Sequence, residues 1–422
     1  MTLSLRAEKN ALTWDRSPVP ARLLVDAYLN DSTTLSHLLK TPWPVDSFSL
    51  GSLDQSSSVK LYASLDDGAG HTLIRCLPAA FAVADVSGGD VGVFCGRVGE
   101  LTTFDATTNA SGLDWGVALS DRYIVLGTKG DVSTIIFDRL ALRTYESTSD
   151  LPVAPRTVAP LDDRSILLVS SDAVVAFDTY SGDTFDVSLD GIEPSEIVGA
   201  TPITADDGTL FVVGATRPTS EGEASDAVLV IDPSGNVSAM RLSKPRIAAS
   251  AAWVPDLGLV VLGGSEPANV EVLAPESTTF SPLNDTTLDA IEGASLALSN
   301  KRLLIVGGGT GTTLTDTLLL DLSCTESCAP KSVGDALGWT ATQTFAQPNG
   351  TWFVRGQDPS TQLVDQVELS FNGTNASFSP ITPAVNPGDR RGGVDVALGE
   401  GWIFRGGGVG SASSKLQLFT PR

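Results

Sequence analysis

The chain has 422 residues, with 27 basic and 50 acidic side chains and a formal net charge of −23 at pH 7. A negative charge of this size opposes binding to a phosphate backbone or to an anionic membrane surface, so we expect no nucleic-acid partner. No apolar run reaches the roughly 18 residues that a membrane-spanning helix needs, so we expect no membrane span. Glycine is abundant (41 residues), methionine is scarce (2 residues), and no long amphipathic run occurs, which predicts an all-β protein.

The N-terminal part, residues 1–77, is predicted to form a small β-sandwich. It contains short strand-like segments separated by polar turns, at residues 21–29, 46–50, 58–65 and 71–76. Apolar and polar side chains alternate along residues 59–65, so one face of that strand is expected to be buried and the other solvated.

The remainder, residues 78–422, carries a repeat. Each copy has a short apolar strand that ends in glycine or serine, as in the LLIVGGG run of residues 303–309. The other copies lie at residues 91–96, 123–127, 166–170, 210–214, 259–264, 352–356 and 402–407. Successive copies begin about 31 to 50 residues apart, which in a β-rich chain is typical of propeller blades. A strand that is apolar on both faces suits a sheet packed between two neighbouring sheets.

The copies count to eight units, and we therefore predict an eight-unit β-propeller, with seven blades as the alternative. The first unit has almost no room for a fourth strand between Asp105 and Leu113, which favours seven. The last unit ends at residues 415–419 and lacks its outer strand. We hypothesise that an earlier segment supplies this strand and closes the ring.

The segment 246–282 carries a family resemblance. It has a strand, a polar turn, the run LVVLGG, the run NVEVLAP and Phe280, and in this order it resembles the kelch repeat of galactose-oxidase-like propellers. The N-terminal 77 residues resemble the small sandwich that precedes kelch units in some bacterial surface lipoproteins. The resemblance covers roughly residues 78–422 and implies a propeller at the cell surface.

Four cysteines occur in two pairs, Cys76 with Cys95 and Cys324 with Cys328, and we predict two disulfides. The competing interpretation of the second pair is half of a metal site, but no histidine stands near it to complete one. Disulfides persist mainly outside the cytosol. Seven of the eleven asparagines lie in N-x-S/T triplets, which indicate glycosylation if the protein is eukaryotic and only turn composition if it is bacterial. We predict an extracellular or cell-surface protein. Residues 1–14 lack the apolar core of a signal peptide, so the chain is either cytoplasmic or has lost an export signal.

Histidine is too scarce for most catalysis. A copper radical oxidase of the galactose-oxidase kind would need two propeller histidines, whereas His37 and His71 both precede the repeat. The same scarcity removes a Ser/His/Asp arrangement, and we predict no catalytic residues, no metal and no cofactor.

Two recurring side chains are given structural roles. Aspartate ends the third strand of five units, and we interpret these residues as turn-closing groups rather than as a ring of ligands: Asp105, Asp138, Asp178, Asp232 and Asp321. Four tryptophans lie inside predicted strands and are expected in the core rather than stacked on sugars: Trp115, Trp339, Trp352 and Trp402.

The position before the strand-end glycine is apolar or cysteine in six units and arginine in the last two, Arg355 and Arg405. Equivalent positions on consecutive blades are neighbours, so these arginines should meet, with Arg390 and Arg391 nearby. One interpretation is internal pairing with a carboxylate, for which the candidates are Asp365, Asp395 and Glu400. The other is a pocket that recognises the carboxylate of an acidic glycan or of a partner's side chain.

Two functions remain compatible with the sequence. The first is a non-catalytic extracellular recognition or scaffold module that binds a protein or glycan at the cell surface through its propeller loops. The alternative is a carbohydrate-active enzyme that uses paired carboxylates.

Overall fold

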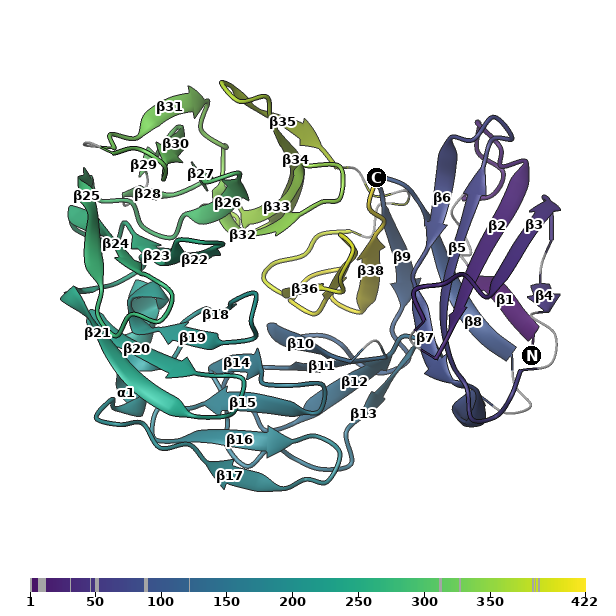
Figure 1. Cartoon of the computed structure of the whole chain (residues 1–422), viewed down its shortest axis with the longest axis horizontal. Coiled ribbons are helices and arrows are strands. Elements are labelled where there is room, and N and C mark those ends of the chain that lie inside the picture. Colours follow the sequence, from purple (N-terminus) through teal and green to yellow (C-terminus); the bar gives the residue numbers. More distant parts are fainter. Residues whose placement is uncertain are drawn as a thin grey trace.

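The computed structural model describes residues 2–6, 13–30, 32–45, 47–49, 53–86, 90–120, 122–310, 313–325, 328–381, 383, 385 and 388–422. These residues form an eight-stranded N-terminal sheet and seven four-stranded sheets that are arranged as the blades of a ring. The fold is therefore an all-β, seven-bladed propeller with an N-terminal sheet beside it (Figure 1).

Each of the first six blades is an antiparallel meander whose strands follow one another from the centre of the ring outward (Figure 1). Blade 1 consists of β10 (Trp115–Leu119), β11 (Tyr123–Gly127), β12 (Thr134–Asp138) and β13 (Arg143–Glu146). Blade 2 consists of β14 (Thr157–Pro160), β15 (Ser165–Val169), β16 (Val174–Asp178) and β17 (Thr184–Asp186). Blade 3 consists of β18 (Pro202–Thr204), β19 (Leu210–Val213), β20 (Ser225–Ile231) and β21 (Val237–Arg246).

Blade 4 consists of β22 (Ser250–Val254), β23 (Gly258–Leu262), β24 (Ala268–Leu273) and β25 (Ser281–Leu288). Blade 5 consists of β26 (Ser295–Ser299), β27 (Arg302–Val306), β30 (Thr317–Asp321) and β31 (Lys331–Gly334). Blade 6 consists of β32 (Thr340–Ala346), β33 (Trp352–Gln357), β34 (Val364–Phe371) and β35 (Ala376–Pro380). Short elements lie between strands: α1 (Pro194–Ile197), η2 (Gly214–Thr216), η3 (Thr219–Glu221), β28 (Gly309–Thr310) and β29 (Thr313–Leu314).

Blade 7 is completed by a strand from the beginning of the propeller. It contains β36 (Val394–Ala397), β37 (Ile403–Gly406) and β38 (Lys415–Phe419), and its outer strand is β9 (Leu101–Asp105). Strand β9 runs antiparallel to β38, with Leu101 opposite Phe419. The hypothesis that an earlier segment closes the ring is confirmed.

The count of eight units is wrong, and the alternative of seven blades is confirmed. The first predicted unit, residues 91–96, lies in β8 (Asp90–Arg97), which belongs to the N-terminal sheet. Its glycine-ended apolar pattern matches the other copies, but β8 pairs with β6 (Thr72–Cys76) and β1 (Thr2–Arg6) instead of with a blade. Pattern alone therefore overcounted the blades by one.

The N-terminal sheet has the strand order β3-β2-β5-β6-β8-β1-β4, with β7 also paired to β5. Its remaining strands are β2 (Arg22–Leu29), β3 (His37–Pro42), β4 (Ser47–Ser49), β5 (Ser58–Asp66) and β7 (Ala79–Ala82), and η1 (Val83–Val86) follows β7. Strands β7 and β8 lie beyond residue 77, where the sequence predicts the end of a small β-sandwich. We propose that the N-terminal unit extends through Arg97, and the sandwich stays a prediction.

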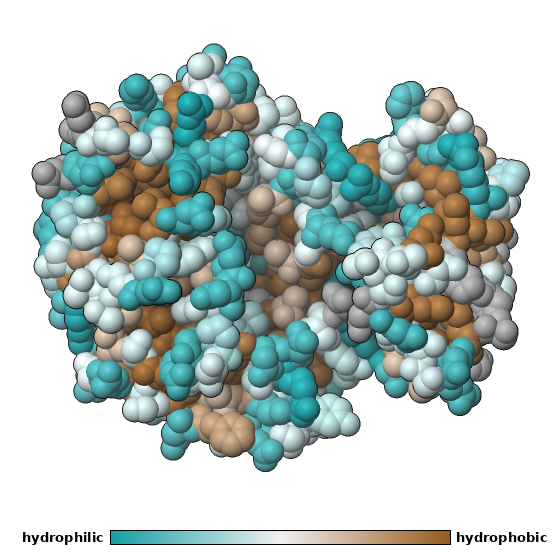
Figure 2. Space-filling model, viewed as in Figure 1, coloured by the Kyte–Doolittle hydropathy of each residue, from teal (hydrophilic) through white to brown (hydrophobic). Residues whose placement is uncertain are grey.

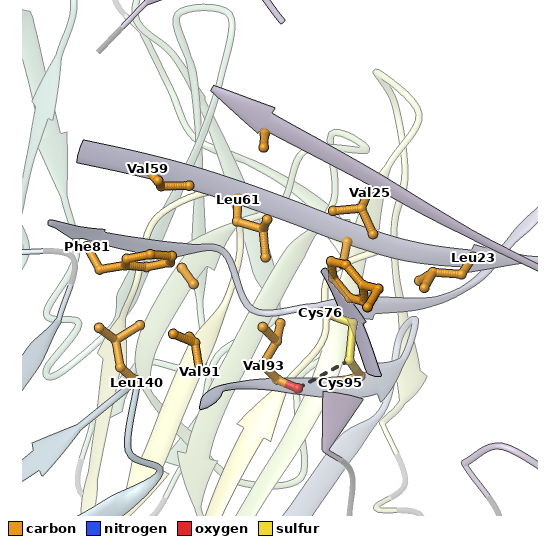
Figure 3. Close-up of a cluster of buried hydrophobic side chains, with 14 of the residues drawn as sticks. Leu23, Val25, Val59, Leu61, Cys76, Phe81, Val91, Val93, Cys95 and Leu140 are labelled. Carbon is orange, nitrogen blue, oxygen red and sulfur yellow. Dashed lines mark hydrogen bonds between the residues drawn. A yellow bond between two sulfur atoms is a disulfide. The ribbon is translucent and has the colours of Figure 1, made fainter. Parts of the chain in front are cut away.

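Both predicted disulfides are present. Cys76 of β6 and Cys95 of β8 are directly opposite in the sheet and bonded, and Cys324 is bonded to Cys328. The first bond lies against the core of the N-terminal sheet, beside Leu23 and Val93 (Figure 3). None of the helices in the described ranges has the length and apolar character needed to cross a membrane.

The N-terminal sheet contacts the propeller through a buried apolar cluster and through an exposed hydrogen bond. Leu140, in the β12–β13 turn of blade 1, is part of the same apolar cluster as Phe81 and Val91 (Figure 3). The hydroxyl of Tyr62 on β5 donates a hydrogen bond to Glu400, in the β36–β37 turn of blade 7, at 2.9 Å. The sheet is therefore fixed against the blades on either side of the ring's closure.

The buried position predicted for the tryptophans is found in the structure, and the turn-closing role predicted for aspartate is found in four of the five units. Asp105 is the exception, because its exposed carboxylate pairs with Lys415. All four tryptophans are buried: Trp115, Trp339, Trp352 and Trp402. Trp115 and Trp352 lie in strands, whereas Trp339 and Trp402 directly precede β32 and β37. Asp138 and Asp178 each accept hydrogen bonds from two backbone N–H groups of the turn that follows, and Asp232 and Asp321 also bond their own turns. These carboxylates hold turns and do not form a ligand ring.

Candidate ligand site between the last two blades

The candidate site lies where blades 6 and 7 meet. In an antiparallel meander, the segment that enters the first strand and the turn between the second and third strands lie at one end of the sheet. We call this the entry end. Arg390 precedes β36, while Arg355 and Arg405 lie near the ends of β33 and β37, so all three are at the entry end of adjacent blades.

Arg405 is held by a buried carboxylate. Its Nε and Nη2 atoms donate to the two oxygens of Asp395 at 2.8 and 2.7 Å, and its Nη1 atom donates to the side-chain oxygen of Gln366. The side chain of Asp395 is 0% exposed and that of Arg405 is 3% exposed. This bidentate geometry is the strong form of the arginine–carboxylate pair.

Arg355 shares the same carboxylate at longer range. Its Nε atom lies 3.7 Å from Asp395 Oδ2, and its Nη2 atom donates to the backbone carbonyls of Gly392 and Gly393 at 2.9 and 3.1 Å. The two arginines predicted to be neighbours therefore meet at Asp395, one of the three carboxylates proposed as a partner. The other two, Asp365 and Glu400, are exposed.

Arg390 is buried without a carboxylate among its hydrogen-bond partners in the described residues. It donates to the backbone carbonyls of Gly407, Ala412 and Lys415. Desolvation, reinforced by the positive charge of Arg405, lowers the pKa of Arg390 to about 10. The adjacent Arg391, which the sequence grouped with it, is exposed and bridges Leu363 and Val409 through its backbone.

Asp395 keeps its charge despite its burial. Desolvation alone would raise its pKa, but the charge and hydrogen bonds of Arg405, with the charges of Arg355 and Arg390, lower the pKa of this carboxyl below its ordinary value of 3.8. Three buried guanidinium groups thus surround a single buried carboxylate, and the cluster has an excess of two positive charges.

A cavity of about 190 Å³ opens beside this cluster. Arg390 and Arg405 line it, together with Gln366, Gln417 and the exposed Asp389. Each of the two guanidinium groups has five N–H donors, of which three are engaged in the hydrogen bonds described above. Within the described part of the chain, two N–H groups on each arginine make no hydrogen bond and could donate to a molecule in the cavity.

Blade 4 shows how the same position is neutralised elsewhere in the ring. Arg246 precedes β22 by four residues, as Arg390 precedes β36, and it donates to the carbonyl of Asn269 on the third strand of its blade. It also pairs with Glu271, two residues further along that strand. Arg390 donates to the carbonyl of Lys415, and the residue two positions further along β38 is the neutral Gln417.

The sequence identified the arginines but not the rest of the cavity. Gln366 and Gln417 lie on third strands, opposite Arg355 and Arg405 in the register, and no local pattern marks them. A comparison of the segments that enter β22 and β36 would have aligned Arg246 with Arg390, and the exchange of Glu271 for Gln417 would then have been visible.

Comparisons with known proteins show the fold of the chain but not its family. No protein-family model matches the chain, and no curated protein matches it. Among solved structures, virginiamycin B lyase from Staphylococcus aureus matches at 10% identity, over 76% of this chain and 99% of that chain, with a TM-score of 0.52. Hydrazine synthase from Kuenenia stuttgartiensis matches at 12% identity, over 74% of this chain and 96% of that chain, with a TM-score of 0.51. The chain is therefore similar to these proteins in its propeller fold.

Proposed function

We propose that this protein is a non-catalytic recognition or scaffold module of the cell exterior, and that Arg390 and Arg405 bind a carboxylate of its ligand. The observation that carries this proposal is the excess of buried positive charge beside an open cavity, with Gln417 standing where blade 4 has Glu271. The ligand class is a carboxylate on an acidic glycan or on a partner protein.

The energetic argument is that buried charge needs a counter-charge. Removing an ion from water costs several kcal/mol after relaxation, and pairing with an opposite charge offsets this cost only when the geometry is good. Arg246 has such a partner in Glu271, whereas Arg390 has only carbonyl dipoles among its hydrogen bonds in the described residues. A carboxylate in the cavity would supply the missing negative charge and accept the remaining N–H donors.

The location and the family are part of this proposal. The two disulfides favour an oxidising compartment, and a surface protein would present the entry end of the ring to a partner protein or glycan. We propose that the blades are kelch-like and that the chain resembles the surface lipoproteins with such blades.

The test is calorimetric titration with two probes, glucuronate and N-acetylaspartate, which represent an acidic glycan and an acidic protein side chain. Wild type should bind at least one, and Arg390→Gln should weaken it about tenfold to a hundredfold, because a hydrogen bond to a charged group contributes roughly 1.5–3 kcal/mol. Arg391→Gln is the matched control, since Arg391 is the exposed neighbour of Arg390. Equal binding by all three proteins, or by none, would refute the proposal.

The alternative, a carbohydrate-active enzyme, requires a carboxyl group that stays protonated near neutral pH. Among the described residues, Asp114 is the carboxyl group with a raised pKa, because burial disfavours its charge more than the N–H of Lys129 stabilises it. A glycosidase would need a second carboxyl group roughly 5–10 Å away. Turnover of a glycan that is lost in Asp114→Asn would establish this alternative in place of the recognition module.

A further inference from the structure

A second cleft lies at the other end of the blades. It has a volume of about 850 Å³, within the usual range for ligand sites, and lies between the N-terminal sheet and blades 1 and 2. The propeller side is formed by turns between first and second strands and between third and fourth strands, which lie opposite the entry end. The outline of the molecule narrows where the N-terminal sheet meets the ring (Figure 2).

Two tyrosines on the propeller side are held in place by arginines. The guanidinium of Arg122 lies over the ring of Tyr123 at 4.9 Å, and that of Arg164 lies over the ring of Tyr180 at 5.0 Å. Both arginines are themselves anchored, since Arg122 pairs with Asp138 and Arg164 with Asp178, each at 3.0 Å. The rings are thus positioned before any ligand arrives, which lowers the entropy cost of binding.

Among the large hydrophobic residues in the described part of the chain, Tyr180 is the most exposed. It is 86% exposed, although its backbone is fixed in the β16–β17 turn by the hydrogen bond from its N–H to Asp178 at 2.8 Å. Arg164 lies over one face of this exposed ring, so the ring can offer its other flat apolar face to a ligand in the cleft. Tyr123, which also lines the cleft, is half-buried on the neighbouring blade.

Two of the three charged residues that line the cleft are acidic. Asp85 of η1 lies on the side of the N-terminal sheet, Asp163 lies in the β14–β15 turn, and both are exposed. The charge of Arg122 is already matched by Asp138, so the lining as a whole has negative charge. Carboxylates accept hydrogen bonds from hydroxyl groups, and in this setting they repel an anionic ligand.

We propose that this cleft binds a neutral oligosaccharide, whose C–H faces stack on Tyr180 and Tyr123 and whose hydroxyl groups donate to Asp85 and Asp163. The site is independent of the cavity at Arg390, because the two share no residues and lie at opposite ends of the blades. A result that refutes the proposed carboxylate recognition would therefore not refute the proposed oligosaccharide site, and the reverse is also true.

The test is calorimetric titration with a panel of neutral pentasaccharides that includes cellopentaose, xylopentaose, maltopentaose and chitopentaose. At least one should bind, and Tyr180→Ala should weaken it about tenfold, or by about 1.4 kcal/mol, because the stacking contact of the ring is lost. Asp163→Asn should also weaken it. Phe185→Ala is the control, because Phe185 is exposed on β17 of the same blade and does not line the cleft.

Retention of pentasaccharide binding by Arg390→Gln would support the independence of the two sites. The proposal is overturned if no pentasaccharide binds, if Tyr180→Ala binds as tightly as wild type, or if a cationic peptide such as pentalysine binds in the cleft while the sugars do not.

Discussion

At the scale of single residues, Asp395 determines how three arginines can be buried together. It accepts two hydrogen bonds from Arg405 and lies within 3.7 Å of Arg355. The repeat was sufficient to predict that Arg355 and Arg405 are neighbours, because equivalent strand positions on consecutive blades are adjacent. It was not sufficient to predict the cavity, since that depends on the register that brings Gln366 and Gln417 beside them.

Replacing Asp395 by Asn should be strongly destabilising. The substitution conserves shape but leaves the buried guanidinium groups of Arg355 and Arg405 without a carboxylate, and breaking a buried pair in this way typically costs about 3–5 kcal/mol. Unfolding in urea at pH 7 measures the loss. Asp365→Asn is the control: Asp365 is exposed, so its replacement should change the free energy of unfolding by no more than about 0.5 kcal/mol.

The cost of Asp395→Asn should also depend on pH. Because the folded pKa of Asp395 is lower than its ordinary value of 3.8, its charge stabilises the folded state above that value, and the stabilisation is lost as the pH falls through the folded pKa. The difference in stability between wild type and variant should therefore shrink below about pH 4. A difference that stays constant from pH 7 to pH 3 would contradict the assignment.

At the scale of elements, strand pairing decided what the local pattern could not. Strand β8 has the apolar run and glycine of a blade strand, yet it lies between β6 and β1 in the N-terminal sheet. Apolar pattern and glycine are local properties, whereas membership of a sheet is fixed by partners far away in the sequence. Cys95 was the available signal, because its bond to Cys76 joins β8 to a strand of the N-terminal part.

The disulfide between β6 and β8 should stabilise the N-terminal sheet appreciably. It closes a loop with a sequence separation of 19 residues, and loop entropy for this length corresponds to about 3 kcal/mol. Cys76→Ala with Cys95→Ala should lose about this amount in thermal unfolding. Cys324→Ala with Cys328→Ala, whose separation is 4 residues, should lose about 2 kcal/mol, because loop entropy falls only slowly as the loop shortens. The reverse order would show that loop length does not determine these contributions.

At the scale of the whole molecule, the ring closes by joining the beginning of the propeller to its end. Strand β9 completes blade 7, and Tyr62 and Leu140 fix the N-terminal sheet to blades 7 and 1. The closing strand was predictable because the last unit lacked an outer strand. The cleft at Tyr180 could not be predicted from the sequence, because it depends on where the N-terminal sheet lies against the ring. The two proposed sites therefore lie at different ends of the ring.

The most direct measurement is the melting temperature of the protein in sodium glucuronate and in sodium N-acetylaspartate, each against sodium chloride at equal ionic strength. A ligand that binds the folded state stabilises it by about 2.7 kcal/mol at a hundredfold excess over its Kd. We expect at least one carboxylate to raise the melting temperature of wild type and of Arg391→Gln, but not that of Arg390→Gln. Identical melting temperatures in all salts, or the same rise in Arg390→Gln, would contradict carboxylate binding at the buried arginines.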